Sequence, residues 1–92
     1  MNQIYKRNKY IIVPVNSDYL VINTNKVFKK GHTHVKKINT AKMLIDFAIF
    51  KEIPKNPYFI GNLIRISDDE TYIEKLKGLS LKNKELKLKV GS

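Results

Sequence analysis

Cysteine and tryptophan are absent from this 92-residue chain, and glycine and proline occur only four and three times. Without cysteine there is no disulfide framework and no thiolate metal site, so a cytoplasmic protein is expected. The low glycine and proline content excludes collagen-like and low-complexity chains. No apolar run approaches the roughly 18 residues of a membrane-spanning helix, and the run at 10–15 is too short for a signal peptide. A single small domain, comprising residues 1–92, is predicted.

Acidic residues are also scarce, because eight of them stand against 18 lysines and arginines and leave a net charge of +10. Residues 26–37, called the basic segment below, hold five lysines, both histidines and no acid. Such a density of positive charge attracts polyanions, so nucleic acid is the first candidate partner. Arginine, whose planar fork reads base edges, occurs only twice. Contacts to the phosphate backbone are therefore favoured over base reading.

Residues 1–38 are predicted to be mainly strands. Two runs rich in β-branched residues, 10–15 and 19–24, flank the turn residues 16–18 and predict a hairpin. Pro14 cannot donate a ladder hydrogen bond, which places it at a sheet edge or at a bulge.

A second hairpin is predicted within the basic segment, with Val27-Phe28 as one strand, 33–35 as the other and Lys30-Gly31 as the turn. Aromatic residues in strands usually belong to a core, but on some sheets they stack single-stranded bases. The four candidates for such stacking are Tyr5, Tyr10, Tyr19 and Phe28.

Residues 39–79 are predicted to be mainly helical. The first helix, 40–53, begins at a cap formed by Asn39 or Thr40 and is ended by Pro54.

The second predicted helix, 57–66, follows an asparagine cap and has proline at its first position. The pair 40–53 and 57–66 has the proportions of a helix-turn-helix motif, with the basic segment as a wing. A plain packed helical hairpin is the more frequent structure for such a pair, because the second helix exposes few polar side chains.

A third helix is predicted from the capping box at Ser67–Glu70 to the neighbourhood of Gly78. Residues 80–92 form a basic tail, in which 84–90 alternate apolar residues with lysines and predict a strand that returns to the sheet, with a frayed helix as the alternative. Strands and helices follow in separate runs, so an α+β fold is predicted. It has a small antiparallel N-terminal sheet of two to four strands, packed against about three α-helices.

His32 and His34 are the residues most suited to a chemical role. Two apart in a strand they share a face, but a metal site needs at least a third ligand, and the nearest carboxylates are remote in sequence. No metal and no cofactor are therefore expected. Together with Tyr10 and either Lys36 or Lys37, His34 could imitate the acid-base set of a metal-free ribonuclease.

The sequence favours a small, basic, non-enzymatic binding protein that contacts a nucleic-acid backbone. The residues expected to contact it, or another partner, are Lys26, Lys29, Lys30, His32, His34, Lys36, Lys37 and Arg65. The main alternative is a phage- or mobile-element-encoded regulator or inhibitor that binds an acidic surface of a host protein. A lesser alternative is a metal-free ribonuclease that uses His32 and His34.

Overall fold

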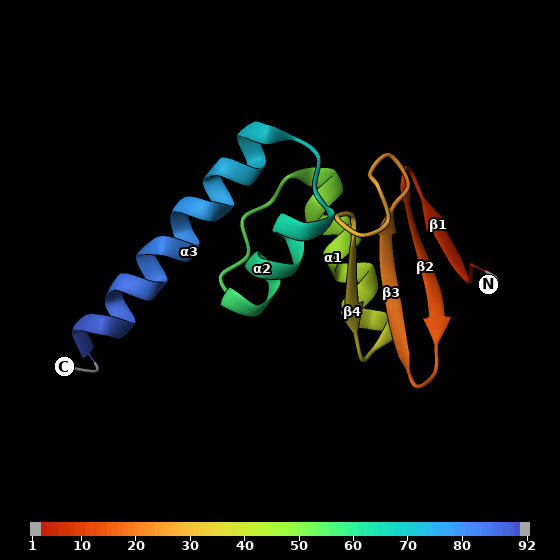
Figure 1. Cartoon of the computed structure of the whole chain (residues 1–92), viewed down its shortest axis with the longest axis horizontal. Coiled ribbons are helices and arrows are strands. Elements are labelled where there is room, and N and C mark those ends of the chain that lie inside the picture. Colours follow the sequence, from red (N-terminus) through yellow and green to blue (C-terminus); the bar gives the residue numbers. More distant parts are fainter. Residues whose placement is uncertain (1–2, 91–92) are drawn as a thin grey trace.

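The computed structural model describes the backbone of residues 3–90 and the side chains of residues 3–80. Within that part, the elements in chain order are β1 (Tyr5–Arg7), β2 (Tyr10–Val15), β3 (Asp18–Asn23), β4 (His32–Val35), α1 (Ile38–Phe50), α2 (Pro57–Ile66) and α3 (Glu70–Val90). The strands form an antiparallel sheet in the order β1-β2-β3-β4. α1 and α2 pack on the sheet, and α3 lies against α2 on the side away from it (Figure 1). The predicted α+β fold is therefore confirmed.

The first predicted hairpin is present as β2 and β3. Val15 pairs with Asp18, which leaves Asn16 and Ser17 as a two-residue turn. Asn16 has a φ of 52°, in the left-handed region that asparagine tolerates better than most residues. The pairing of β1 with β2 reaches only to Ile12, so Pro14 lies where one side of β2 is an edge, as its missing N–H requires.

The second hairpin differs from its prediction. β4 pairs directly with β3, and residues 24–31 form the connecting loop instead of a strand at Val27 and Phe28. Gly31 is needed where this loop closes, because a Cβ there would lie 2.5 Å from the Cβ of Lys26. The short strand β1 was not predicted, although Asn8, with a φ of 60°, marks its turn into β2.

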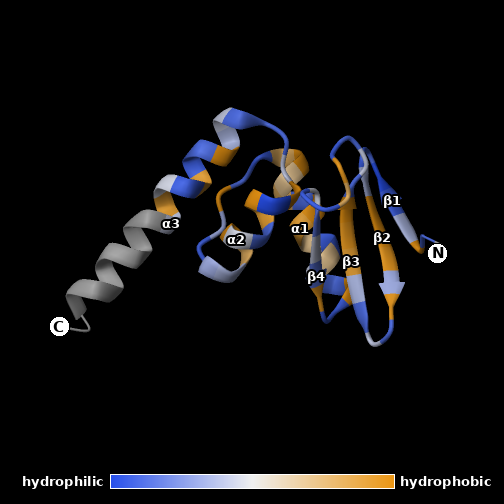
Figure 2. Ribbon diagram, viewed as in Figure 1, coloured by the Kyte–Doolittle hydropathy of each residue, from blue (hydrophilic) through white to orange (hydrophobic). Residues whose placement is uncertain are grey.

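The hydrophobic core lies between the helices and one face of the sheet. Alternate strand residues point into it, as in the pair Ile12 and Val21, and Leu44 of α1 is fully buried there. Figure 2 shows the apolar residues that line β2 and β3. The buried members of the core are Tyr10, Ile12, Val21, Val35, Ala41, Leu44, Ile45, Ala48, Ile60, Leu63, Ile66, Tyr72 and Leu76.

The boundaries of α1 differ from those predicted. It begins at Ile38, two residues earlier than expected, and neither predicted cap is used, because Lys37 precedes the helix without a side-chain capping bond. It ends at Phe50 because Lys51 turns into the left-handed region and its N–H donates to the carbonyl of Phe47. Pro54 excludes a longer helix, but this cap ends it sooner.

α2 agrees with its prediction, since the Asn56 side chain accepts a hydrogen bond of 3.0 Å from the N–H of Tyr58. The predicted capping box at Ser67–Glu70 is wrong. α3 is capped by Asp69, which accepts from the N–H of Tyr72 at 3.0 Å, whereas the backbone N–H of Ser67 closes the end of α2.

The predicted end of α3 near Gly78 is wrong, because α3 continues to Val90. Of the two alternatives for 84–90, the structure has the helix and not the return strand. Leucine, lysine and glutamate are good helix formers, and extending a helix adds one hydrogen bond for each residue fixed. The alternation of apolar and basic residues at 84–90 was therefore a poorer guide to structure than the presence of a helix directly before them. Among the described residues, no helix is both long and apolar enough to cross a membrane.

Candidate functional site

The two histidines lie on the face of the sheet opposite the helices. His32 is paired with Ile22 and His34 with Leu20, whereas Thr33 and Val35, the alternate residues of β4, point into the core. This surface is called the open face below. The registers of the four strands assign to it Lys6, Ile11, Val13, Val15, Asp18, Leu20, Ile22, His32 and His34. Of these, Val13 and Leu20 are only 4% exposed.

Three aromatic rings are in contact at the β4 edge of the open face, and are called the ring cluster. Phe28 stacks on His32 with the ring centroids 4.3 Å apart and the planes inclined by 7°. His34 meets His32 edge to face, at 5.5 Å and 75°. Nδ1 of His32 lies 2.5 Å from the carbonyl oxygen of Phe28. Because a carbonyl only accepts, Nδ1 carries the hydrogen of this bond.

Lysines lie at both ends of β4, before and after the histidines of the ring cluster. Lys29 and Lys30 follow Phe28 in the loop, and Lys36 and Lys37 follow β4; all four are exposed and form no ion pair among the described side chains. Three basic residues elsewhere are paired with acids: Arg7 with Asp46, Lys9 with Asp68 and Lys51 with Asp69. Other described basic side chains are also without an ion pair, namely Lys6, Lys42, Lys55, Arg65, Lys75 and Lys77. What distinguishes Lys29, Lys30, Lys36 and Lys37 is their position on either side of the ring cluster in the sequence.

Lys26 has a different position from the other lysines of the basic segment. Its Nζ donates to the carbonyl oxygens of Arg65, at 3.1 Å, and Ser67, at 2.9 Å. The neighbouring Asn23 donates to the carbonyl of Ile66 at 2.7 Å. A cation at these carbonyls, which form the negative end of α2, is favourable. Lys26 thus anchors the loop to α2, and the Arg65 side chain lies exposed at the base of that loop.

The tyrosines predicted as stacking residues lie with the helices instead. Tyr10 is only 2% exposed and belongs to the core, and Tyr5 and Tyr19 pack against the same core. Of that set only Phe28 joins the histidines. Tyr10 and His34 consequently lie on opposite faces of the sheet, so the acid-base set of the ribonuclease hypothesis is not assembled.

α2 packs against the rest of the domain and does not present a polar face to a DNA groove, as the helix-turn-helix hypothesis would require. Ile60, Leu63 and Ile66 are buried, and the Asn62 amide accepts from the Thr33 hydroxyl and donates to the carbonyl of Tyr58. Among the described side chains, no three histidine, aspartate or glutamate groups are placed to hold a metal ion.

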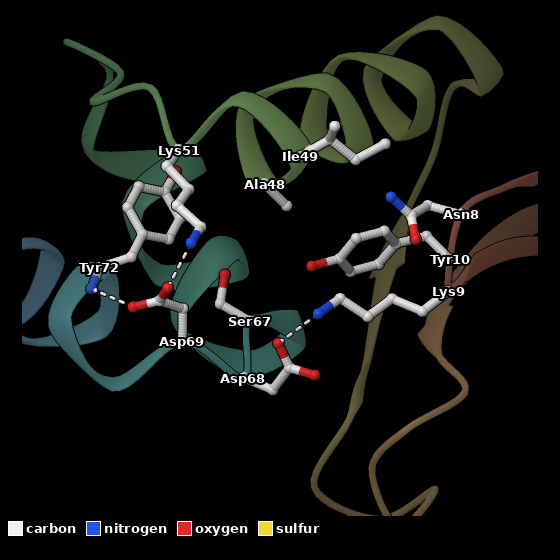
Figure 3. A pocket seen from close by; sticks show the side chains of 10 residues that line it. All are labelled: Asn8, Lys9, Tyr10, Ala48, Ile49, Lys51, Ser67, Asp68, Asp69 and Tyr72. Carbon is white, nitrogen blue, oxygen red and sulfur yellow. Dashed lines mark hydrogen bonds and ion pairs between the residues drawn. The ribbon is translucent and has the colours of Figure 1, made fainter.

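A cavity of about 450 Å³ is the other candidate site (Figure 3). It lies between the β1–β2 turn, the end of α1 and the α2–α3 connection. Its charged groups pair with each other: Lys9 lies 2.7 Å from Asp68, and Lys51 contacts Asp69. Burial raises the pKa of Asp68, but hydrogen bonds from Lys9 and Asn23, together with the charge of Lys9, outweigh burial and leave that pKa below its usual value.

The tyrosines of this cavity are structural. Burial raises the pKa of both Tyr10 and Tyr72 to about 12, with smaller contributions from the charge of Asp68 and, for Tyr72, from Tyr10 and Glu52. Both phenols therefore keep their protons at neutral pH. The hydroxyl of Tyr72 donates to the carbonyl of Glu52 at 2.6 Å and so fixes the chain after α1.

Neither models of protein families nor curated proteins nor solved structures match this chain. Of the two candidate sites, the cavity pairs its charges internally, whereas the lysines beside the ring cluster leave theirs unpaired. The ring cluster with these lysines is therefore the better candidate for binding a partner.

Proposed function

We propose that the protein binds nucleic acid through phosphate contacts on the lysine-bordered side of the open face. The observation that supports this most is that Lys29, Lys30, Lys36 and Lys37 are exposed and have no acidic partner among the described side chains. Lys29 and Lys30 precede β4, and Lys36 and Lys37 follow it. The two cations of each pair repel one another, and a polyanion that runs along β4 relieves the repulsion in both pairs. His32 and His34 lie between the two lysine pairs in the sequence, and an imidazole N–H donates hydrogen bonds to phosphate oxygens.

Lysine contacts of this kind give affinity with little sequence preference. Each phosphate neutralised releases bound counterions, so the logarithm of the binding constant falls linearly with the logarithm of salt concentration, by about 0.9 per phosphate on duplex and about 0.7 on single strands. Binding in the micromolar range at low salt is expected from so few contacts.

The test is the fluorescence anisotropy of a labelled oligonucleotide, titrated with protein at several salt concentrations from about 50 to 200 mM. Replacing Lys29, Lys30, Lys36 and Lys37 together with glutamine should reduce the magnitude of the salt slope by about three to four on duplex, and by about three on a single strand.

A matched control removes the same charge elsewhere. Replacing Lys42, Lys55, Lys75 and Lys77, all exposed, with glutamine lowers the net charge equally. This control should keep most of the slope if the contacts are localised, and should match the first variant if only net charge matters. No binding by the unmodified protein at the lowest salt would refute the proposed function.

A role in protein binding is the second candidate, favoured by exposed apolar side chains on and after α1. Met43, Phe50 and Ile53 are between 43% and 60% exposed. Exposed apolar groups that cluster mark many protein interfaces. Affinity capture from cell extract with and without nuclease treatment separates the candidates, because only a protein partner is retained after nuclease.

A further inference from the structure

Phe28 is held in a loop that presents its ring to solvent. Its side chain is 48% exposed and that of the adjacent Val27 is 72% exposed, although both are large and apolar. One face of the Phe28 ring is covered by His32, stacked at 4.3 Å. The exposed fraction leaves the other face open. An apolar ring in this position gains nothing from the core, so its exposure calls for another explanation.

The loop is also held in place at both ends. Lys26 anchors its beginning to the carbonyls of Arg65 and Ser67, and the N–H of Asn23 donates to the carbonyl of Gly31 at 2.8 Å to close it. The bond from His32 to the backbone carbonyl of Phe28 holds the loop backbone there, and the His32 ring stacks on the Phe28 ring. A ring already fixed loses little conformational entropy when a second flat group stacks on it.

We propose that the open face of the Phe28 ring stacks an unpaired base, so that the ligand is single-stranded nucleic acid. This rests on the proposed binding of nucleic acid and adds its class. Every base has a flat face that an aromatic ring can stack on, and the lysines next to Phe28 supply the phosphate contacts that such a strand needs. In a duplex the faces of the bases are covered by their neighbours, so the ring has nothing to stack on.

The test compares three labelled probes of equal length: a single strand, the matching duplex, and a single strand of abasic sites that keeps the phosphates but lacks the bases. Stacking of one base on an aromatic ring changes affinity by about five- to 150-fold. The base-bearing single strand should bind more tightly than the abasic strand by a factor in that range.

Variants at Phe28 locate the effect. Phe28→Ala should reduce binding of the base-bearing strand to the level of the abasic strand and leave the abasic strand unaffected, while Phe28→Tyr should retain the difference. Phe50→Ala, which removes an exposed ring from α1, serves as the control and should change neither probe. Circular dichroism of each variant shows whether the fold is intact.

The outcomes separate the two proposals. If the protein binds the abasic and base-bearing strands equally, or if Phe28→Ala binds as the unmodified protein does, stacking is refuted while phosphate binding stands. If duplex binds more tightly than the single strand, the single-stranded assignment is wrong. If no probe binds, the proposed function fails and the assignment fails with it.

Discussion

Replacing Ser67 with alanine is expected to stabilise the protein. The Ser67 side chain is 2% exposed, and its hydroxyl is buried without a hydrogen-bond partner among the described atoms. Burying an unpaired hydroxyl costs about 1–3 kcal/mol relative to water. Alanine removes that group and leaves only a small void. The backbone N–H that closes α2 on the carbonyl of Leu63, at 2.9 Å, is unchanged. A gain of about 1 kcal/mol is therefore expected.

The matched comparison is Thr33→Val. Thr33 is equally buried, but its hydroxyl donates to the amide oxygen of Asn62. Valine has nearly the same volume, so this variant deletes a satisfied hydroxyl and leaves the acceptor of Asn62 without its donor. A loss of about 1 kcal/mol is expected, opposite in sign to the change at Ser67.

Urea unfolding followed by circular dichroism measures both variants, and thermal unfolding checks them, since about 1 kcal/mol shifts the midpoint by roughly 4–8 °C in a domain of this size. A loss of stability in Ser67→Ala similar to that in Thr33→Val would refute the reasoning. It would mean that the Ser67 hydroxyl has a partner, such as water held in the adjoining cavity.

Two further predictions concern acid and catalysis. The folded-state pKa of Asp69 is held below its usual value first by the hydrogen bond from Lys51 and then by that from the N–H of Tyr72, and the pKa of Asp68 is lowered on balance as well. A carboxyl with a lowered folded-state pKa stabilises the protein above its unfolded pKa of about 4, and this contribution is lost as pH falls through the folded-state value. Asp68→Asn and Asp69→Asn should each make acid unfolding below about pH 4 less steep, measured by circular dichroism, and an unchanged profile would contradict the assigned ion pairs. We also expect no cleavage of labelled RNA or DNA by the purified protein, with chelator or with added zinc. Cleavage that is lost in the His32→Ala, His34→Ala double variant while binding persists would make the protein a nuclease.

Local chemistry accounts for the parts of the fold that could be predicted. The turn at Asn16 and Ser17 and the cap at Asn56 with Pro57 depend on residues within a few positions of each other, so their sequence signals are nearly complete. The length of α3 is decided differently, because a helix already formed extends through residues whose own pattern fits a strand.

The candidate site could be predicted only in part, because its composition is local but its arrangement is tertiary. Alternation along β4 places His32 and His34 on one face, and this followed from the sequence. Whether the two histidines point toward the helices or away from them depends on how β4 pairs with β3. The same pairing places Tyr10 and His34 on opposite faces of the sheet. The sequence contained no signal that Lys26 would reach the end of α2, because its partners are backbone carbonyls about 40 residues away.

The lysines of the basic segment have two different roles in this fold. Lys26 gives its charge to α2 and holds the loop, whereas Lys29 and Lys30, three and four residues on, remain exposed without acidic partners among the described side chains. Three acidic residues, Asp46, Asp68 and Asp69, instead pair with basic residues on the helix side of the sheet. An exposed ion pair contributes at most about 1 kcal/mol, so stability alone hardly distinguishes where the pairs form. The exposed lysines lie beside an aromatic ring held open to solvent, and that combination suits a flexible polyanion with flat bases better than it suits the folded state alone.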